Sequence, residues 1–392
     1  MSTFCYSRNV KIILRKINDN VLLKGCHRNI AEVSNSWDRV PLKDVQRFIE
    51  ECMVKVGTSS KHAKYLATNL VAADYRGHYS HGLNRLDMYV KDIETGTTCN
   101  DKEPSIVKET VATALVDGNN TLGPVTGNFS MNVAIEKANN VGIGWVVAKG
   151  SNHYGIAGFY AMEASKQGLL GMSFTNTSPL SVPTRAVKPT LGTNPISLAA
   201  PAGKDSFVLD MATTTAALGK IELHDRKGIN IPNSWGVDSR GKECNDPKPV
   251  LESGGLMPLG GSELTGGYKG YGLAMLVEIF CGILSGSTYG PNIRKWRNTT
   301  TVANLGQCFV AIDPNAFAPG FEDRMSDLIN TCRSLQPAEG EDKVLVAGDP
   351  ETQHMSNCDK IGGIPYHPNQ IQFGIDLAKK LGVMEMNVIK NS

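Results

Sequence analysis

Apolar residues between positions 41 and 56, among them Phe48 and Ile49, recur every three or four residues, which is the spacing of one side of a helix. The same pattern predicts two further helices, over residues 61–73 and 83–93. Ser59 or Ser60 is the expected N-cap of the first of these, because a serine hydroxyl can accept from the unpaired backbone N–H groups of a helix start. The first part of the fold is therefore predicted to be helical.

Beyond residue 110 the pattern changes to short apolar runs that alternate with helical stretches. The runs predict strands over residues 111–118, 141–148, 169–175, 205–211, 306–312 and 343–347. Helices are predicted over residues 126–140, 158–167, 321–335 and 371–381, with a helix start at 213–218. This alternation is typical of an α/β protein. Changes of pattern near residues 110 and 315–320 predict domain boundaries.

The longest apolar stretch, residues 273–284, contains Glu278 and is far shorter than the ~20 residues that span a bilayer. It predicts a core helix, and no membrane partner is expected. A net charge of +2 with dispersed basic residues gives no argument for a nucleic-acid partner. The nine cysteines are odd in number and widely spaced, which favours free thiols in a reducing compartment, and their spacing offers no zinc site. We expect a cytoplasmic enzyme.

The leading segment differs from the rest of the chain. Residues 1–31 hold six basic residues against the single acid Asp19, a net charge of +5, which leaves −3 for the remainder of a chain whose total is +2. Two interpretations stay open for this basic leader, a mitochondrial transit peptide or an extension outside the fold.

A histidine-rich polar segment, residues 76–82, lies between two predicted helices, and Arg85 follows in the second of them. In the functional interpretation, Ser80 and His81 face a substrate and Arg85 holds a carboxylate through two parallel hydrogen bonds. The alternative is that the histidines cap a helix or are solvated. The His-x-x-His spacing of His78 and His81 would also suit a metal, but no third ligand is near, so no metal site is predicted.

His153 follows a predicted buried strand and stands between Asn152 and Gly155. Side chains at strand ends commonly line ligand crevices in α/β folds, and an imidazole can exchange a proton with a ketone oxygen as hydride is transferred. The alternative is a loop histidine bonded to the backbone.

A glycine-rich segment, residues 266–272, precedes the long apolar stretch and contains Lys269. Glycines let the backbone approach a ligand, and a helix start together with a lysine favours an anionic group. The alternative is a flexible loop. No strand is followed by the Gly-x-Gly-x-x-Gly fingerprint, so a nicotinamide cofactor would bind outside the usual Rossmann motif.

Six short motifs, taken together and in this order, resemble the malate/L-lactate dehydrogenase family of the non-Rossmann type, over about residues 40–385. They are Ala-Asp-Tyr-Arg-Gly-His-Tyr-Ser-His-Gly at 73–82, Ser-Asn-His-Tyr-Gly-Ile-Ala-Gly at 151–158, Leu-Gly-Thr-Asn-Pro at 191–195, Leu-Asp-Met-Ala-Thr-Thr at 209–214, Ile-Pro at 231–232 with Trp235, and Gly-Tyr-Lys-Gly-Tyr-Gly at 267–272. The family includes sulfolactate, ureidoglycolate, diketogulonate and cyclic imino-acid oxidoreductases.

The resemblance implies an α/β fold with a central, largely antiparallel mixed sheet flanked by helices, and a homodimer. Together with the changes of pattern and the basic leader, it predicts a leader (residues 1–39), a helical domain (40–110), a catalytic NAD(P)-binding domain (111–315) and a C-terminal segment (316–392) that packs on the helical domain.

By position, the resemblance makes His153, with His81, the catalytic pair, and Ser80 and Arg85 substrate ligands. The cofactor residues that it implies are Thr177, Asp210, Met211, Ala212, Lys269, Gly348, Pro350 and Glu351. NAD is the expected cofactor and NADP the alternative.

One segment departs from the family. Many members have two glycines after the Val-Pro pair at 182–183, where this chain has Thr184, Arg185 and Ala186. Arg185 could meet a second substrate carboxylate or a cofactor phosphate. We therefore expect hydride transfer to a small 2-oxo acid, with malate/oxaloacetate ahead of lactate. Sulfolactate, ureidoglycolate and cyclic imino acids stay open as substrates, and so does a dinucleotide-binding dimer without catalysis.

Overall fold

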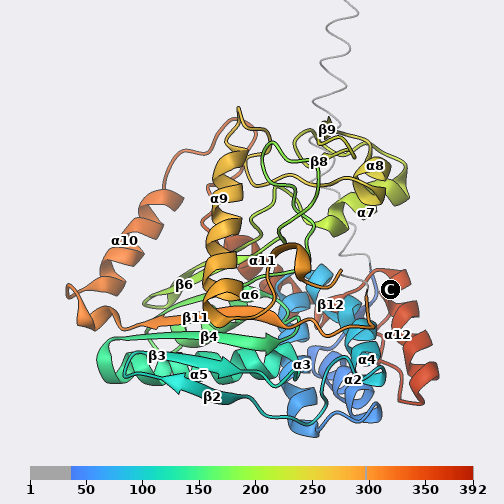
Figure 1. Cartoon of the computed structure of the whole chain (residues 1–392), viewed down its shortest axis with the longest axis horizontal. Coiled ribbons are helices and arrows are strands. Elements are labelled where there is room, and N and C mark those ends of the chain that lie inside the picture. Colours follow the sequence, from blue (N-terminus) through green and yellow to red (C-terminus); the bar gives the residue numbers. More distant parts are fainter. Residues whose placement is uncertain (1–36, 296–297, 392) are drawn as a thin grey trace, which may run out of the picture.

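A seven-stranded mixed sheet lies at the centre of the computed structural model, which describes residues 37–295 and 298–391 (Figure 1). Its strands, in spatial order, are β2 (Ser105–Glu109), β3 (Thr113–Asp117), β4 (Ile143–Ser151), β11 (Leu305–Ile312), β5 (Leu170–Thr175), β6 (Ile196–Ala202) and β7 (Asp205–Met211). Only β3 and β4 are parallel neighbours within this sheet. The predicted largely antiparallel sheet is confirmed.

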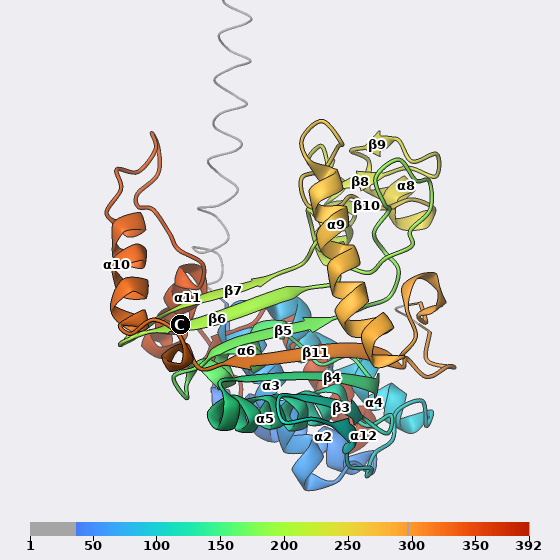
Figure 2. The same ribbon diagram turned by 60° about the vertical axis from the view of Figure 1, so that its left-hand side comes forward.

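The sheet is apolar on both faces, as alternate residues of β11 show. Phe309 and Ala311 pack on the side covered by α5 (Gly123–Val141) and α6 (Ala157–Ser165). Cys308 and Val310 pack on the other side, against α9 (Gly267–Glu278) and the π-helix that continues it, Ile279–Ile283. Figure 2 shows α5 and α6 on one side of the sheet and α9 rising from the other. Burial on both faces explains why the sequence of β11 is a nearly continuous apolar run.

Helices from the two ends of the described chain form one further layer. The helices are α2 (Leu42–Lys55), α3 (Ser60–Tyr75), α4 (Leu86–Glu94), α11 (Asp349–Ile361) and α12 (Pro368–Leu381). They share a single core that includes Phe48, Leu66 and Leu377, and β1 (Arg39–Val40) pairs with β12 (Ile364–Pro365) beside it. This confirms that the N-terminal helical part packs beside the C-terminal part, whereas α10 (Phe321–Arg333) lies along β6 instead. The domain boundaries stay predictions.

A small unit that the sequence did not predict sits above the sheet beside the upper part of α9 (Figure 2). It contains α7 (Leu218–Lys227), β8 (Gly236–Val237), β9 (Glu243–Cys244), α8 (Pro247–Glu252) and β10 (Gly255–Leu256). Short 3-10 helices occur elsewhere, at Tyr79–His81, Leu83–Arg85, Gly290–Asn292 and Pro314–Ala316. Two-residue strands carry too little periodicity to be recognised from a sequence pattern.

Two element predictions were wrong. The helix expected to start at 213–218 starts only at Leu218, because the hydroxyls of Thr213 and Thr214 donate to backbone carbonyls and so compete with helical hydrogen bonds. Residues 343–347 form no strand. There the Val346 N–H donates to the side chain of Asp349, and the missed helix α11 follows.

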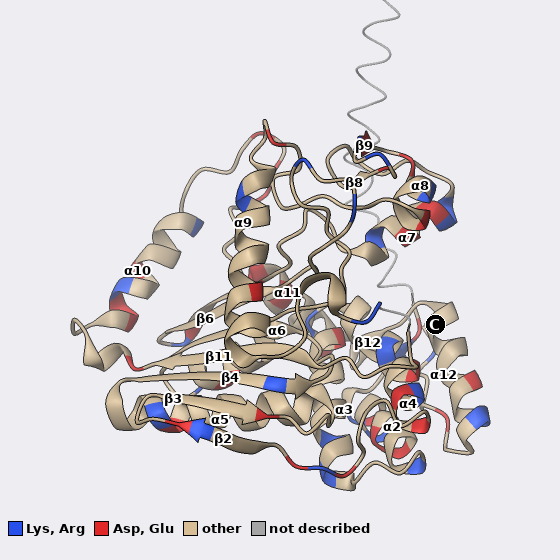
Figure 3. Ribbon diagram, viewed as in Figure 1, with Lys and Arg blue, Asp and Glu red and all other residues tan. Residues whose placement is uncertain are grey.

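The prediction of a core helix over residues 273–284 was wrong in part. Helix α9 already begins at Gly267, so the glycine-rich segment is helical and is neither a turn nor a loop. Gly270 packs against the backbone of Leu259, where a Cβ would clash. One face of the helix is exposed, with Ile279 and Ile283 about half accessible. Figure 3 shows that charged residues gather on outer helices such as α2, α4, α7 and α12, whereas α9 carries few.

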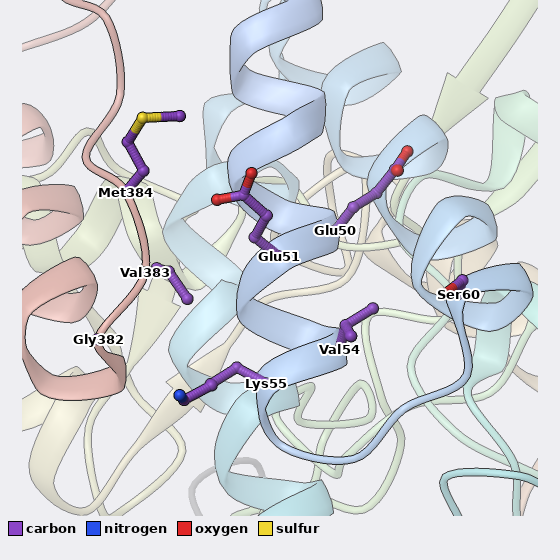
Figure 4. Close-up of a pocket in the computed structure, with 8 residues that line it drawn as sticks. All are labelled: Glu50, Glu51, Val54, Lys55, Ser60, Gly382, Val383 and Met384. Atoms are coloured by element: carbon purple, nitrogen blue, oxygen red, sulfur yellow. The ribbon is translucent and has the colours of Figure 1, made fainter.

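A hollow with a volume of about 490 Å³ lies between α2, the start of α3 and residues 382–384 (Figure 4). Its lining mixes acidic Glu50 and Glu51 with Lys55 and the apolar Met384. None of the predicted site residues lines it, so this hollow is distinct from the candidate site.

Among residues 37–295 and 298–391, no helix is long and apolar enough to cross a bilayer. The cysteines in that part of the chain are free thiols. The basic leader lies almost wholly outside the described residues, so both interpretations of it stay open.

Candidate active site

The histidine-rich segment forms a tight turn between α3 and α4. We call residues 78–85 the histidine turn. Ser80 Oγ lies 2.9 Å from His81 Nδ1, and Arg85 Nε donates to the Ser80 carbonyl oxygen at 2.5 Å. The turn therefore brings the three residues that the sequence placed at the substrate into one hydrogen-bonded group.

His153 lies where β4 runs into α6, and Tyr89 of α4 holds its ring. The Tyr89 hydroxyl lies 2.5 Å from His153 Nδ1, and the backbone nitrogen of Gly155 lies 3.4 Å from the same atom. The Tyr89 hydroxyl donates to the His153 carbonyl oxygen at 3.3 Å, so its own oxygen accepts from Nδ1, and the proton of the neutral ring is then on Nδ1 with Nε2 as the basic nitrogen. We infer this tautomer from the partners of the ring.

The rings of His81 and His153 stack, with centroids 5.8 Å apart and planes 19° apart. Burial, together with the charges of Arg85 and His78, lowers the pKa of His81 to about 4. Burial also lowers the pKa of His153 well below its ordinary value, with His81, Arg85 and Arg294 as further causes. Both imidazoles are therefore neutral near pH 7, and they share one electrostatic environment with Arg85.

The predicted cofactor residues on β7 and α11 lie beside this group. Asp210, at the end of β7, accepts from the N–H of Gly158 at 2.6 Å, close behind the His153 loop. Glu351 in the first turn of α11 pairs with His78 of the histidine turn at 3.4 Å. Burial raises the pKa of Asp210, and the hydrogen bond from His78 lowers the pKa of Glu351.

Thr177 follows β5 and is held by the loop that precedes β6. Its N–H donates to Asn194 Oδ1 at 3.1 Å, and its hydroxyl accepts from the Thr193 N–H at 2.9 Å. Asn194 in turn donates to the buried carboxylate of Glu278 at 2.8 Å. The acidic residue that interrupts the long apolar stretch therefore anchors the loop that positions Thr177.

The sequence model of the malate/L-lactate dehydrogenase family matches residues 40–373. The chain belongs to this family. A malate dehydrogenase of Pyrococcus abyssi is 38% identical over 359 residues, which cover 91% of this chain and 98% of that protein. An L-sulfolactate dehydrogenase of Methanocaldococcus jannaschii is 37% identical over 311 residues, or 79% and 88% of the two chains.

Solved structures agree with this membership. The malate dehydrogenase of Pyrococcus horikoshii superposes with a TM-score of 0.82 at 38% identity, covering 89% of this chain and 97% of that one. The malate dehydrogenase of Entamoeba histolytica gives 0.84 at 32% identity, with 88% and 98% covered. The protein is thus a dehydrogenase that acts on a small molecule with a nicotinamide cofactor, and the resemblance inferred from the six motifs is confirmed.

The edge formed by β7 and α11 carries polar and charged side chains of the kind that can bind a nicotinamide dinucleotide. Asp210 and Glu351 carry carboxylate oxygens of the kind that can accept from ribose hydroxyls, and the positive charge of Arg76 acts on both. Gly348 has a φ of +102° and lies so close to β7 that its Cβ would be 3.3 Å from that of Val208. A larger residue there would strain the backbone and narrow the edge.

Two predicted ligands are exposed, one in the segment between β5 and β6 and the other on α9. Arg185 is 80% exposed and binds Glu263 through two hydrogen bonds, of 2.7 and 2.9 Å. Lys269 is exposed in the first turn of α9, with its Nζ 5.9 Å from the ring centroid of Tyr268. Their roles toward substrate and cofactor stay predictions. Among the described residues, no group of three or more His, Cys, Asp or Glu is arranged to hold a metal.

The sequence analysis missed Tyr89 and the pair Arg294–Asp92. Tyr89 follows Arg85 by four residues at the start of a predicted helix, so helical spacing could have placed both on one side. Arg294 Nη2 lies 2.5 Å from Asp92 Oδ2, both are nearly buried, and the charge of Arg294 acts on His153. Two residues 202 positions apart leave no local signal.

Proposed function

We propose that the protein interconverts malate and oxaloacetate with NAD, and that His153 carries the proton. The observation that supports this most strongly is the stacked, neutral pair of His81 and His153 beside Arg85. A neutral imidazole can accept the hydroxyl proton of a 2-hydroxy acid, and a guanidinium can hold its carboxylate. The malate dehydrogenases among the similar proteins support the choice of substrate.

Three residues of the histidine turn have a part in this proposal. Arg85 binds the C1 carboxylate, and Ser80 and His81 line the substrate. His153 Nε2 takes the proton from the C2 hydroxyl during oxidation and returns it to the C2 oxygen during reduction. The nicotinamide cofactor supplies or accepts the hydride at C2. Arg185 is the proposed ligand of the second carboxylate, which distinguishes malate from lactate.

We propose that the cofactor is held by Thr177, the end of β7, the first turn of α11, and Lys269. The residues at β7 are Asp210, Met211 and Ala212, and those at α11 are Gly348, Pro350 and Glu351. NAD is favoured over NADP, because a 2′-phosphate near Asp210 and Glu351 would meet like charge.

We also propose a homodimer that covers the exposed face of α9 and its continuation. That face presents apolar side chains that are 37–54% accessible, namely Tyr268, Met275, Leu276, Ile279, Ile283 and Leu284. A contiguous apolar surface of this kind usually marks an interface. Ile279→Glu is expected to yield monomers in light scattering coupled to size-exclusion chromatography. Leu328→Glu, on the exposed side of α10, is the matched control and should leave the oligomer intact.

The compartment also belongs to this proposal. We favour the cytoplasm, with mitochondrial import as the alternative that the basic leader suggests. A fluorescent fusion to residues 1–39 tests import directly, since a passenger that stays in the cytoplasm excludes a transit peptide.

The activity is tested by following NADH absorbance with the purified full chain and oxaloacetate, pyruvate, 2-oxoglutarate or a cyclic imino acid. The same series is repeated with NADPH. The proposal expects the highest kcat/KM with oxaloacetate and NADH. A higher kcat/KM with another acid would make that acid, in place of oxaloacetate, the substrate. Absence of turnover with every acid, despite NADH binding, would contradict the proposal as a whole.

A further inference from the structure

A buried carboxyl group lies directly beneath the histidine turn. Asp74, in the last turn of α3, has no accessible surface. Its Oδ2 accepts from the Leu83 N–H at 2.9 Å and from the Tyr366 hydroxyl at 2.7 Å. Gly82 packs so tightly on the other carboxyl oxygen that a Cβ there would lie 1.9 Å from Oδ1. The carboxyl group therefore occupies the centre of the turn.

We infer that Asp74 is a positioning residue, which holds Ser80, His81 and Arg85 in the geometry that binds the substrate carboxylate. This inference rests on the proposed function for the identity of the substrate. Ser80 and His81 precede the contact at Gly82, and Arg85 follows the contact at Leu83. One side chain thus fixes the backbone between the two groups of substrate ligands.

The contact also ties the site to a distant part of the chain. Tyr366 follows β12 and is itself fully buried in the core shared by the N-terminal and C-terminal helices. Its hydroxyl reaches Asp74 across a separation of 292 residues. A loosening of the C-terminal layer would therefore shift Arg85 and His81 through Asp74. This shift would need no substitution of the residues that touch the substrate.

The charge of Asp74 sets how firmly the turn is held. The titratable groups around it are Tyr366 beside β12, Tyr79 of the histidine turn and Cys358 of α11; burial and the charge of Asp74 raise the pKa of each, and none of them is a cation. Burial raises the pKa of Asp74 to about 7. Ionised Asp74 accepts stronger, charge-assisted hydrogen bonds than its protonated form, so the hold on the turn tightens as pH rises through 7.

Asp74→Asn tests this inference, because the amide keeps the shape and one acceptor oxygen but cannot become an anion. The expected result is a rise in KM for the 2-oxo acid of about tenfold at pH 8, below the ~10²-fold cost of a fully misplaced group. The difference from the wild type should shrink at pH 6, where Asp74 is protonated. Tyr366→Phe, which leaves the Leu83 contact in place, should show a smaller rise.

A control separates positioning from general destabilisation. Leu66→Ala removes a buried core side chain from the same helix and should lower Tm while leaving KM and its pH dependence unchanged. Binding of oxalate, a non-reacting dicarboxylate, is measured by calorimetry in parallel, so the inference is tested even if no 2-oxo acid is turned over. Equal KM and equal oxalate affinity in Asp74→Asn and wild type, at pH 6 and at pH 8, would overturn it.

Discussion

Replacing His153 with alanine is expected to lower kcat for malate and for oxaloacetate by about 10²- to 10⁴-fold, the contribution of a positioned acid or base. KM should change far less, since the carboxylate ligand Arg85 is retained. This residue is proposed because Tyr89 orients its ring through Nδ1 at 2.5 Å and the ring stacks on His81 of the histidine turn. Steady-state kinetics in both directions measure the effect.

Tyr89→Phe is the matched variant for this prediction. It removes the hydroxyl that orients the ring but leaves the imidazole in place, so its loss of kcat should be clearly smaller than that of the alanine variant. A His153→Ala enzyme with near-normal kcat would show that another group carries the proton, and His81 would be the next residue to replace.

The depressed pKa of His153 fixes the expected pH dependence. The neutral, base form persists above a pKa that lies well below the ordinary value. Malate oxidation needs this base, so its kcat/KM should stay level down to pH values below about 6.5 and fall only in more acidic solution. Reduction needs the protonated ring, so its kcat/KM should fall as pH rises. A bound substrate carboxylate beside Arg85 offsets part of the positive charge that lowers the pKa.

The sequence pattern was sufficient to predict features that depend only on residues close together in the chain. Phe48 and Ile49 lie on the buried side of α2 as their spacing predicts, and Ser59 caps α3 by accepting from the His62 N–H. The predicted strand over 205–211 matches β7. The histidine turn and the His153 loop were recognisable because their residue types are unusual between apolar elements.

A sequence pattern could not predict the contacts that complete the site. Asp74 meets Tyr366 and Arg294 meets Asp92 only after the chain has folded, across hundreds of residues. Glu278 looked like an interruption of an apolar helix, yet it accepts from Asn176, Asn194 and the Gly290 N–H. Periodicity reports which side of an element is apolar, but it says nothing of which partner a buried polar group will find.

The exposed face of α9 shows another limit of prediction from sequence patterns. Its apolar residues are indistinguishable in sequence from core residues, because a surface that a second subunit covers, as proposed for this face, would have an apolar composition like that of an interior. The glycines at its start are helical for a related reason. Gly267 and Gly270 lie against the backbone of Gly261 and Leu259, where any side chain would clash, and this close approach outweighs the poor helix propensity of glycine.

Arg85→Ala is expected to lower kcat/KM for every 2-oxo acid by on the order of 10²- to 10³-fold, mainly through KM, as a loss of about 3–4 kcal/mol would give. The reason is that Arg85 is oriented by its bond to the Ser80 carbonyl and carries the charge proposed to meet the C1 carboxylate, which all these acids share. Arg85→Lys keeps the charge but loses the bidentate geometry and should recover only part of the activity.

Arg185→Ala distinguishes the roles proposed for Arg85 and Arg185. If Arg185 meets the second carboxylate, its loss should lower kcat/KM for oxaloacetate and leave pyruvate unaffected, whereas loss of Arg85 should affect both acids. Arg185 first has to leave Glu263, so Glu263→Gln should improve the KM for oxaloacetate. Arg85→Ala also removes a cation that lowers the pKa of His153, so the acid limb of malate oxidation should move to higher pH. A variant that lost affinity without this pH shift would place Arg85 at the substrate but away from the imidazole.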